Sequence, residues 1–76
     1  MNTYIINKNR QDSKSGLNYE VHKLNDCNHL PNLENRIELG IFNDCEKAVA
    51  YAKDLYPKQA KDIDGCYYCC YSCHNE

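Results

Sequence analysis

The sequence is poor in residues that build a large core or a flexible chain. Its 76 residues include no tryptophan, one phenylalanine, one methionine, two prolines and three glycines. A chain this short buries only about 60% of the surface that its unfolded form exposes, so a metal ion, disulfides or a partner often adds stability. It contains no glycine-rich phosphate loop, Gly-x-Ser-x-Gly elbow or His-Glu-x-x-His helix. We therefore predict a protein that is not an enzyme.

Neither a strong charge of one sign nor a long apolar run is present. Nine basic and eleven acidic residues give a net charge of −2, whereas nucleic-acid-binding domains usually carry a basic face. No stretch approaches the roughly 20 apolar residues of a membrane span. Residues 1–7 lack the basic and apolar regions of a secretory signal. We expect a cytoplasmic protein with a protein partner, no membrane and no nucleic acid; the sequence does not indicate its oligomeric state.

Cysteine, by contrast, is abundant. Six cysteines occur, and four of them lie with a histidine in the segment 66–74, which reads Cys-Tyr-Tyr-Cys-Cys-Tyr-Ser-Cys-His. In a reducing cytosol such clusters are more often metal ligands than disulfides. A metal site is therefore the favoured interpretation, with disulfides and free thiols as alternatives.

Three short strands are expected from β-branched and aromatic content, at residues 4–6, 19–24 and 36–41. Residues 7–16 are polar and contain Ser-Gly, so they are expected to form an exposed loop. In the third strand, alternate residues would line one face of the sheet: Ile37, Leu39 and Ile41.

One helix is expected to follow Asn43, which would be its N-cap, with Glu46 completing a capping box. Pro57 would end the helix. Apolar residues recur at helical spacing and form one stripe: Cys45, Ala48, Val49, Ala52, Leu55 and Tyr56. These elements predict one α+β domain, residues 1–76, with a small antiparallel sheet of about three strands, one packed helix and a Cys-rich C-terminal metal-binding turn.

Two pairs of residues have the spacing of zinc ligands. A tetrahedral zinc site usually draws its four ligands as pairs from two segments. Cys66 and Cys69 form a Cys-x-x-Cys pair, and His22 with Cys27 lies at the end of the second strand and in the following turn. The predicted Zn²⁺ ligands are therefore His22, Cys27, Cys66 and Cys69, with His29 as a rival to His22.

A second set of potential ligands remains. Cys70, Cys73 and His74 could form a second site with Cys45, or Cys73 and His74 could replace ligands of the first site. Cys45 also fits a buried apolar position on the helix, because a free cysteine behaves as a small hydrophobe. The sequence leaves these alternatives open.

Tyrosines alternate with the cysteines of the C-terminal segment, at Tyr67, Tyr68 and Tyr71. Their rings could pack over the metal and against the sheet, with the hydroxyl groups in water. Alternatively, they could form an aromatic recognition surface.

A longer pattern spans residues 19–74. It comprises Glu20-Val21-His22-Lys23-Leu24, Cys27, Leu30-Pro31, Asn35-Arg36, Leu39-Gly40, Phe42, Ala48 and Gly65-Cys66-Tyr67-Tyr68-Cys69. This pattern resembles the Ada-type metal-binding domain, and more closely short Cys-rich bacterial proteins ending in Gly-Cys-Tyr-Tyr-Cys and a Cys-His pair. The resemblance implies zinc bound through His22, Cys27, Cys66 and Cys69.

The resemblance does not extend to repair chemistry. In Ada-type repair domains, a zinc-bound thiolate at the first ligand position accepts a methyl group from a DNA phosphotriester. Here His22 takes that position and offers no thiolate. We therefore expect a small zinc-binding domain with a structural metal site, in a protein-interaction module. The alternatives are a thiol-redox protein using a Cys-x-x-Cys pair and a diverged Ada-like nucleic-acid-binding module.

Overall fold

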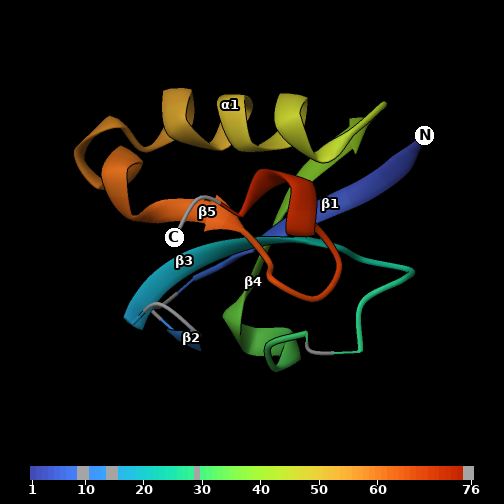
Figure 1. Ribbon diagram of the computed structural model, residues 1–76, viewed down its shortest axis with the longest axis horizontal. Coiled ribbons are helices and arrows are strands. Elements are labelled where there is room, and N and C mark those ends of the chain that lie inside the picture. Colours follow the sequence, from blue (N-terminus) through green and yellow to red (C-terminus); the bar gives the residue numbers. More distant parts are fainter. Residues whose placement is uncertain (9–10, 14–15, 29, 75–76) are drawn as a thin grey trace.

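A small sheet with helix α1 (Cys45–Leu55) on one face forms the body of the molecule (Figure 1). This computed structural model describes residues 1–8, 11–13, 16–28 and 30–74, of which 11–13 and 16–18 are described by their backbone alone. The strands are β1 (Asn2–Asn7), β2 (Gln11–Ser13), β3 (Gly16–Lys23), β4 (Arg36–Phe42) and β5 (Ile63–Gly65). Three 3₁₀ turns complete the elements: η1 (Leu33–Asn35), η2 (Pro57–Asp62) and η3 (Tyr71–Cys73). The predicted α+β class is confirmed.

The strands are ordered β2-β3-β1-β4, and β5 also pairs with β3. All the pairings are antiparallel except that of β5, which runs parallel to β3. The three predicted strands are present as β1, β3 and β4, whereas β2 and β5 are additional. β2 lies within residues 7–16, the stretch predicted as a loop, and Asn7 at its start is a buried residue of β1. Residues 9–10 and 14–15 of that prediction lie outside the described residues.

Strand β4 does not keep the strict alternation predicted for it. Tyr4 of β1 pairs with Gly40, but the next residue of β1, Ile5, pairs with Glu38, so Leu39 is the extra residue of a bulge. Gly40 has φ of 121°, which glycine adopts readily. After the bulge the alternation is reversed, and Ile41 is 65% exposed. The prediction that Ile41 shares the buried face was therefore wrong.

Helix α1 begins one residue later than predicted. Asp44, not Asn43, is the N-cap, and its carboxylate accepts a hydrogen bond from the Lys47 N–H at 3.0 Å. The residue three positions after this N-cap is Lys47, so Glu46 does not complete the predicted capping box. Most of the predicted stripe is buried against the sheet: Cys45, Ala48, Val49 and Ala52. Leu55, in contrast, is 47% exposed, because the helix ends there and Pro57 begins η2.

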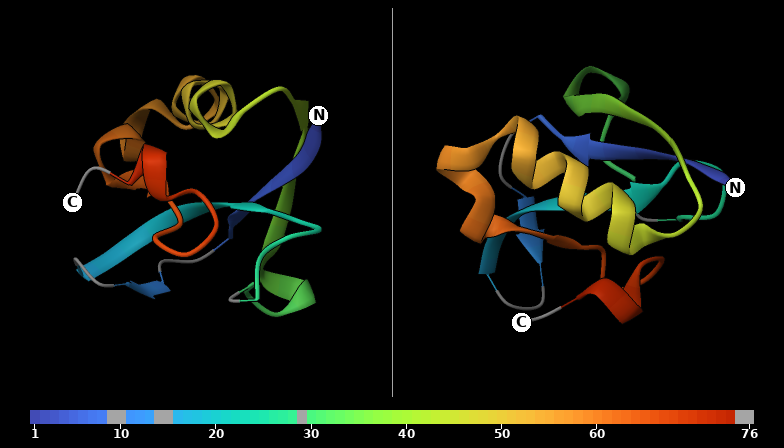
Figure 2. Two further views of the ribbon diagram at one scale, coloured as in Figure 1. Left: turned by 45° about the vertical axis from the view of Figure 1, so that its right-hand side comes forward. Right: turned by 90° about the horizontal axis from the view of Figure 1, so that it is seen from above.

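The core lies between α1 and one face of the sheet. Tyr4, Val21, Ala48 and Ala52 have no exposed surface, and the two alanines let the helix approach the strands closely. Figure 2 shows that η3, near the C-terminal end, lies beside α1 and thus flanks the same core. Within the described residues, no helix has both the length and the apolar character needed to cross a bilayer.

Candidate metal centre

The parallel pairing of β5 with β3 brings together segments that lie far apart in the sequence. Val21 pairs with Gly65, and the N–H of Cys66 donates to the Val21 carbonyl at 2.9 Å. The next residue of each strand is a predicted ligand, so this register places Cys66 near His22. A turn after β3, closed by the Cys27 N–H on the Lys23 carbonyl at 3.1 Å, returns Cys27 to the same place.

The four predicted primary ligands form one cluster. The ligand atoms of His22, Cys27, Cys66 and Cys69 all lie within 4.8 Å of one another. The Cys27 and Cys66 sulfurs are 3.8 Å apart. The His22 Nδ1 is 3.5 Å from the Cys27 sulfur and 4.0 Å from the Cys69 sulfur.

Two of these three separations match the edges of a zinc tetrahedron, and the His22–Cys69 separation is longer. With Zn–S bonds of about 2.3 Å and Zn–N bonds of about 2.0 Å, tetrahedral geometry requires S···S edges of about 3.8 Å and S···N edges of about 3.5 Å. Three ligand residues are also buried, with exposed fractions of 0% for His22, 8% for Cys27 and 1% for Cys66. The cluster could therefore hold a metal ion with four protein ligands.

The other ring nitrogen of His22 is oriented by polar neighbours. Nε2 lies 3.2 Å from the Asn7 Oδ1 and 3.9 Å from a Glu20 carboxylate oxygen, and both residues are buried. A metal-bound histidine commonly donates its second N–H to such a group, which fixes the tautomer and the ring orientation. The Lys23 N–H similarly donates to the Cys69 sulfur at 3.4 Å. The protein thus orients two of the four ligands through a second layer of contacts.

Without a metal, the cluster binds its protons tightly. The hydrogen bond that the Cys66 thiol donates to Cys69 and burial together raise the pKa of Cys66 to about 12. For Cys69, the hydrogen bond with Cys66 lowers the pKa, but Cys70 and burial outweigh it and the pKa is raised. Burial works to lower the pKa of His22, yet hydrogen bonds to Cys66 and Cys27 raise it overall. Any metal ion must therefore displace protons from these thiols.

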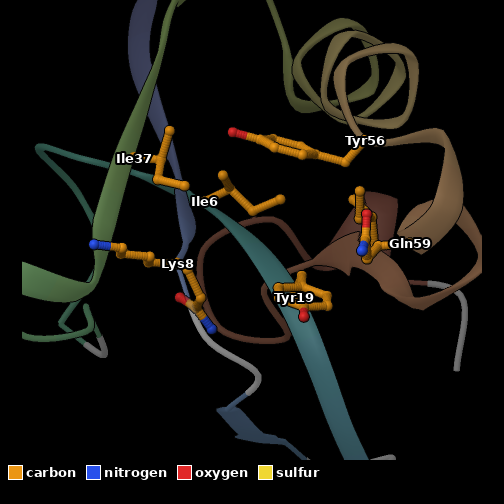
Figure 3. A pocket seen from close by; sticks show the side chains of 8 residues that line it. Ile6, Lys8, Tyr19, Ile37, Tyr56 and Gln59 are labelled. Atoms are coloured by element: carbon orange, nitrogen blue, oxygen red, sulfur yellow. The ribbon is translucent and has the colours of Figure 1, made fainter.

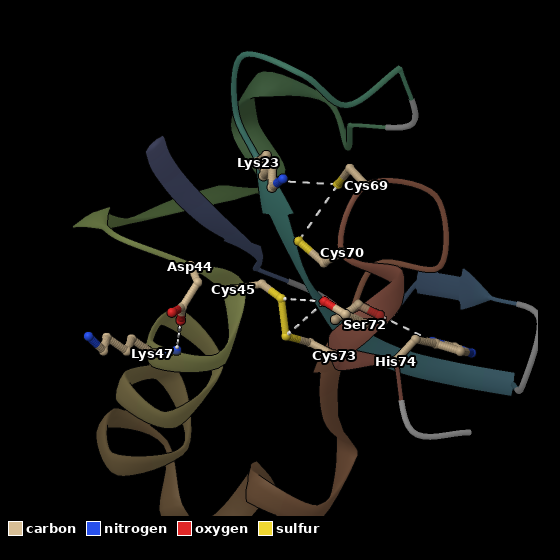
Figure 4. Close-up of a disulfide and its surroundings, with 10 residues drawn as sticks. Lys23, Asp44, Cys45, Lys47, Cys69, Cys70, Ser72, Cys73 and His74 are labelled. Atoms are coloured by element: carbon tan, nitrogen blue, oxygen red, sulfur yellow. Dashed lines mark hydrogen bonds between the residues drawn. A yellow bond between two sulfur atoms is a disulfide. The ribbon is translucent and has the colours of Figure 1, made fainter. Parts of the chain in front are cut away.

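The second predicted ligand set does not form a metal site. Cys45 and Cys73 form a disulfide with an S–S distance of 2.02 Å and Cα atoms 6.3 Å apart, so their sulfurs are not available as ligands (Figure 4). The sequence correctly suggests that Cys45 and Cys73 approach each other, but not the bond they form. Among the described residues, the only cluster of potential ligands is the one around His22.

The remaining members of that set have other contacts. Cys70 is 2% exposed, and its sulfur lies 4.0 Å from that of Cys69. His74 donates from Nδ1 to the Gly65 carbonyl at 3.1 Å, and the same nitrogen is 3.0 Å from an Asp64 carboxylate oxygen. His29, the rival to His22, lies outside the described residues.

Sequence reasoning missed the residues that support the ligands. Asn7 was assigned to a loop, although it faces the His22 ring. Gly65 appeared only as part of the pattern that resembles the Ada-type domain. A Cβ at this position would lie 2.7 Å from the Cys70 carbonyl oxygen and 2.7 Å from the Cys73 Cβ, so the C-terminal turn requires glycine there. Only the strand register identifies either residue, and no local motif encodes that register.

Comparison of the chain with models of protein families, with curated proteins and with solved structures finds no match. The resemblance to the Ada-type domain therefore stays a prediction.

Proposed function

We propose that this protein is a small zinc-binding domain in which Zn²⁺ is a structural ion, and that it acts as a cytoplasmic protein-interaction module. The observation that carries the proposal is the cluster of ligand atoms of His22, Cys27, Cys66 and Cys69, all within 4.8 Å of one another. The Cys27–Cys66 and His22–Cys27 separations are also close to the edges of a tetrahedron around zinc. Three thiolates and one imidazole suit zinc better than the hard ions calcium and magnesium, which prefer oxygen ligands.

A structural role follows from the number and burial of the ligands. Catalytic zinc keeps an open position for water or substrate, whereas structural sites are closed by four protein side chains. Here four side chains converge, and three of the four residues are buried. We therefore propose that the protein is not an enzyme and that the zinc ion joins the turn after β3 to the turn after β5.

Exposed aromatic rings support a role in protein interaction. Tyr68 and Tyr71 are 57% and 66% exposed, and both make edge contacts with Tyr67, with ring centroids 5.3 and 5.1 Å apart. All three follow Cys66 in the Cys-rich segment, so a bound metal would hold the rings in place. Tyrosine is enriched in the buried centre of protein interfaces.

The two alternative functions have less support. A Cys-x-x-Cys redox site needs a thiol of low pKa, whereas the pKa of Cys66 is about 12 and that of Cys69 is raised. The pKa of Cys70 is lowered, but Cys73, its partner in the second Cys-x-x-Cys pair, is bonded to Cys45 in the disulfide. An Ada-like module would need a basic surface for DNA, and the net charge is −2. The disulfide itself is more typical of an oxidising compartment, whereas the thiols of Cys27, Cys66 and Cys69 suit the cytoplasm that we propose.

Native mass spectrometry of protein purified without added metal tests the zinc site. We expect one zinc ion per chain and loss of that ion in Cys69→Ser. The matched control is Cys70→Ser, because it removes the adjacent sulfur, which lies outside the cluster. The proposal fails if the wild-type chain carries no metal, or if Cys69→Ser and Cys70→Ser bind zinc equally well.

A further inference from the structure

A pocket of about 190 Å³ lies beside the C-terminal end of α1, where Tyr56 and Gln59 line it (Figure 3). Isoleucines from three strands form part of its wall, namely Ile6 of β1, Ile37 of β4 and Ile63 of β5. The rings of Tyr19 and Tyr56 complete the apolar lining. The pocket is thus an extension of the hydrophobic face of the sheet.

The pocket exists because the helix ends before the sheet does. Helix α1 ends at Leu55, and the chain turns at Pro57 into η2. The residue of η2 that lines the pocket is Gln59, which is polar and only half-buried. Among the three isoleucines of the wall, Ile37 is only half-buried.

The pocket has a single charged residue at its edge. Among the described residues that line it, Lys8 carries a positive charge and no residue carries a negative one. Lys8 is exposed, whereas Ile6 and Ile63 are 2% and 3% exposed. The lining is therefore mostly apolar inside, apart from the buried Asn7 amide, and carries a single positive charge at the rim. This arrangement complements a molecule with an apolar body and one anionic end.

We propose that this pocket binds a small aromatic monocarboxylate, of about the size of benzoate. The volume of 190 Å³ is slightly larger than the roughly 150 Å³ of an apolar cavity that takes up one benzene molecule. One ring with one carboxylate therefore fills it, and the usual drug-sized ligand, which needs at least about 300 Å³, does not fit. The ring would lie against the isoleucines and Tyr56, and the carboxylate beside Lys8.

The pocket also has a direct connection to the zinc cluster. Asn7 lines the pocket, and its Oδ1 accepts a hydrogen bond from the Nε2 of His22 at 3.2 Å. A ligand that shifts Asn7 would thus alter the environment of the His22 ring. This link depends on the proposed metal site, whereas ligand binding in the pocket does not.

Nuclear magnetic resonance titration of the ¹⁵N-labelled protein, as purified with its zinc, tests the proposal. Benzoate should cause saturable shifts confined to the pocket residues and His22, with a dissociation constant on the order of 1 mM for a ligand of this size. Benzylamine has the same ring and the opposite charge, so it should bind at least about fivefold more weakly. An absence of saturable shifts up to 20 mM benzoate, on the order of twenty times the expected constant, would overturn the proposal, and so would equal binding of benzylamine.

Variants locate the site. Gln59→Trp should fill the pocket from its half-buried edge and abolish the shifts, and Lys8→Gln should weaken benzoate binding by about threefold to fivefold, as for an exposed ion pair. The matched control is Lys58→Gln, because Lys58 is exposed and does not line the pocket. Unchanged binding in a well-dispersed spectrum of Gln59→Trp would contradict the assignment. Zinc content, measured on the same samples, reports separately on the proposed function.

Discussion

Two adjacent cysteines show how strongly position decides the chemistry of a single residue. The Cys69 sulfur belongs to the metal cluster, whereas the Cys70 sulfur lies 4.0 Å away and outside it. The hydrogen bond with Cys69 lowers the pKa of Cys70, while the pKa of Cys69 is raised. Each residue belongs to its own Cys-x-x-Cys pair, Cys69 with Cys66 and Cys70 with Cys73. The sequence motif is therefore the same, and only the position of each cysteine in the folded turn distinguishes them.

Zinc binding is expected to release protons from the thiols. The pKa values of Cys66, about 12, and Cys69 are raised in the metal-free fold, so both thiols are protonated at pH 7.5. A zinc ligand must be a thiolate. We expect at least about two protons to be released per zinc, and the affinity for zinc to rise with pH throughout the range below the pKa of Cys66. Calorimetric titrations in buffers of different ionisation enthalpy measure the number of protons.

The same raised pKa has a consequence for the metal-free protein. A thiol whose pKa is higher in the folded state favours folding below its unfolded-state pKa. That contribution is lost as the pH rises towards the folded-state value of about 12. The metal-free fold should therefore lose stability at alkaline pH, whereas the zinc-loaded fold should not, because its thiols are already deprotonated. Equal alkaline sensitivity of the two forms would contradict the assignment of Cys66 as a ligand.

Tyr4 carries a buried hydroxyl group that contributes little to folding. The side chain is 0% exposed, and its oxygen has no hydrogen-bond partner among the described residues. A buried polar group without a partner costs about 1–3 kcal/mol. Tyr4→Phe keeps the ring and its edge contact with Phe42, at 6.1 Å between centroids. We expect the free energy of unfolding in urea to stay equal or to rise by about 1 kcal/mol; a loss of more than about 1 kcal/mol would reveal a partner for the hydroxyl.

At the scale of elements, the sequence predicts the strands and the helix whose apolar residues follow a recognisable local pattern. The three strands and the helix have clear patterns, and all four were found. Strand β5 was missed because its three residues, Ile63 to Gly65, include a single β-branched one and end in Asp-Gly, which is typical of a turn, and its partner β3 lies some forty residues earlier. The bulge at Leu39 was missed because the apolar residues alternate without interruption through it.

In the candidate site, too, features encoded by local spacing were predicted, and features that depend on contacts between distant elements were not. Ligand spacing within each segment predicted all four residues of the cluster. The roles of Cys45 and Cys73 depend on the packing of η3 against α1, which no local spacing encodes. Cys45 and Cys73 were therefore predicted as possible metal ligands, whereas the fold brings their sulfurs together in a disulfide.

The disulfide ties the C-terminal segment to the helix. It joins Cys45, the first residue of α1, to Cys73, which lies 28 residues later. Closing a loop of this length stabilises a fold by about 3–4 kcal/mol in the chain-entropy model. We expect Cys45→Ser with Cys73→Ser to lower the free energy of unfolding by about that amount, measured by urea denaturation. Zinc stoichiometry should stay at one, since neither residue belongs to the cluster; loss of zinc from the folded variant would contradict this separation.

At the scale of the whole molecule, two cross-links join segments that the core alone holds weakly. The proposed zinc ion would connect the turn at Cys27 to the turn at Cys69, and the disulfide connects α1 to η3. A chain of 76 residues has a total stability of only about 4–11 kcal/mol, at the usual 0.05–0.15 kcal/mol per residue. Each cross-link thus supplies a large share of the total.

Removal of both cross-links is expected to unfold the protein. Zinc at a thousandfold excess over its dissociation constant stabilises by about 4 kcal/mol, and the disulfide adds about 3–4 kcal/mol. Their contributions are expected to add, because the two sites share no residue. EDTA alone should lower the thermal midpoint by about 15–30 °C, and EDTA applied to the variant without the disulfide should leave no cooperative transition. EDTA saturated with zinc is the control, and circular dichroism follows the unfolding. Intact small domains unfold at roughly 45–65 °C. If the variant without the disulfide still unfolds cooperatively above 50 °C in EDTA, within roughly that range, the core suffices without either cross-link.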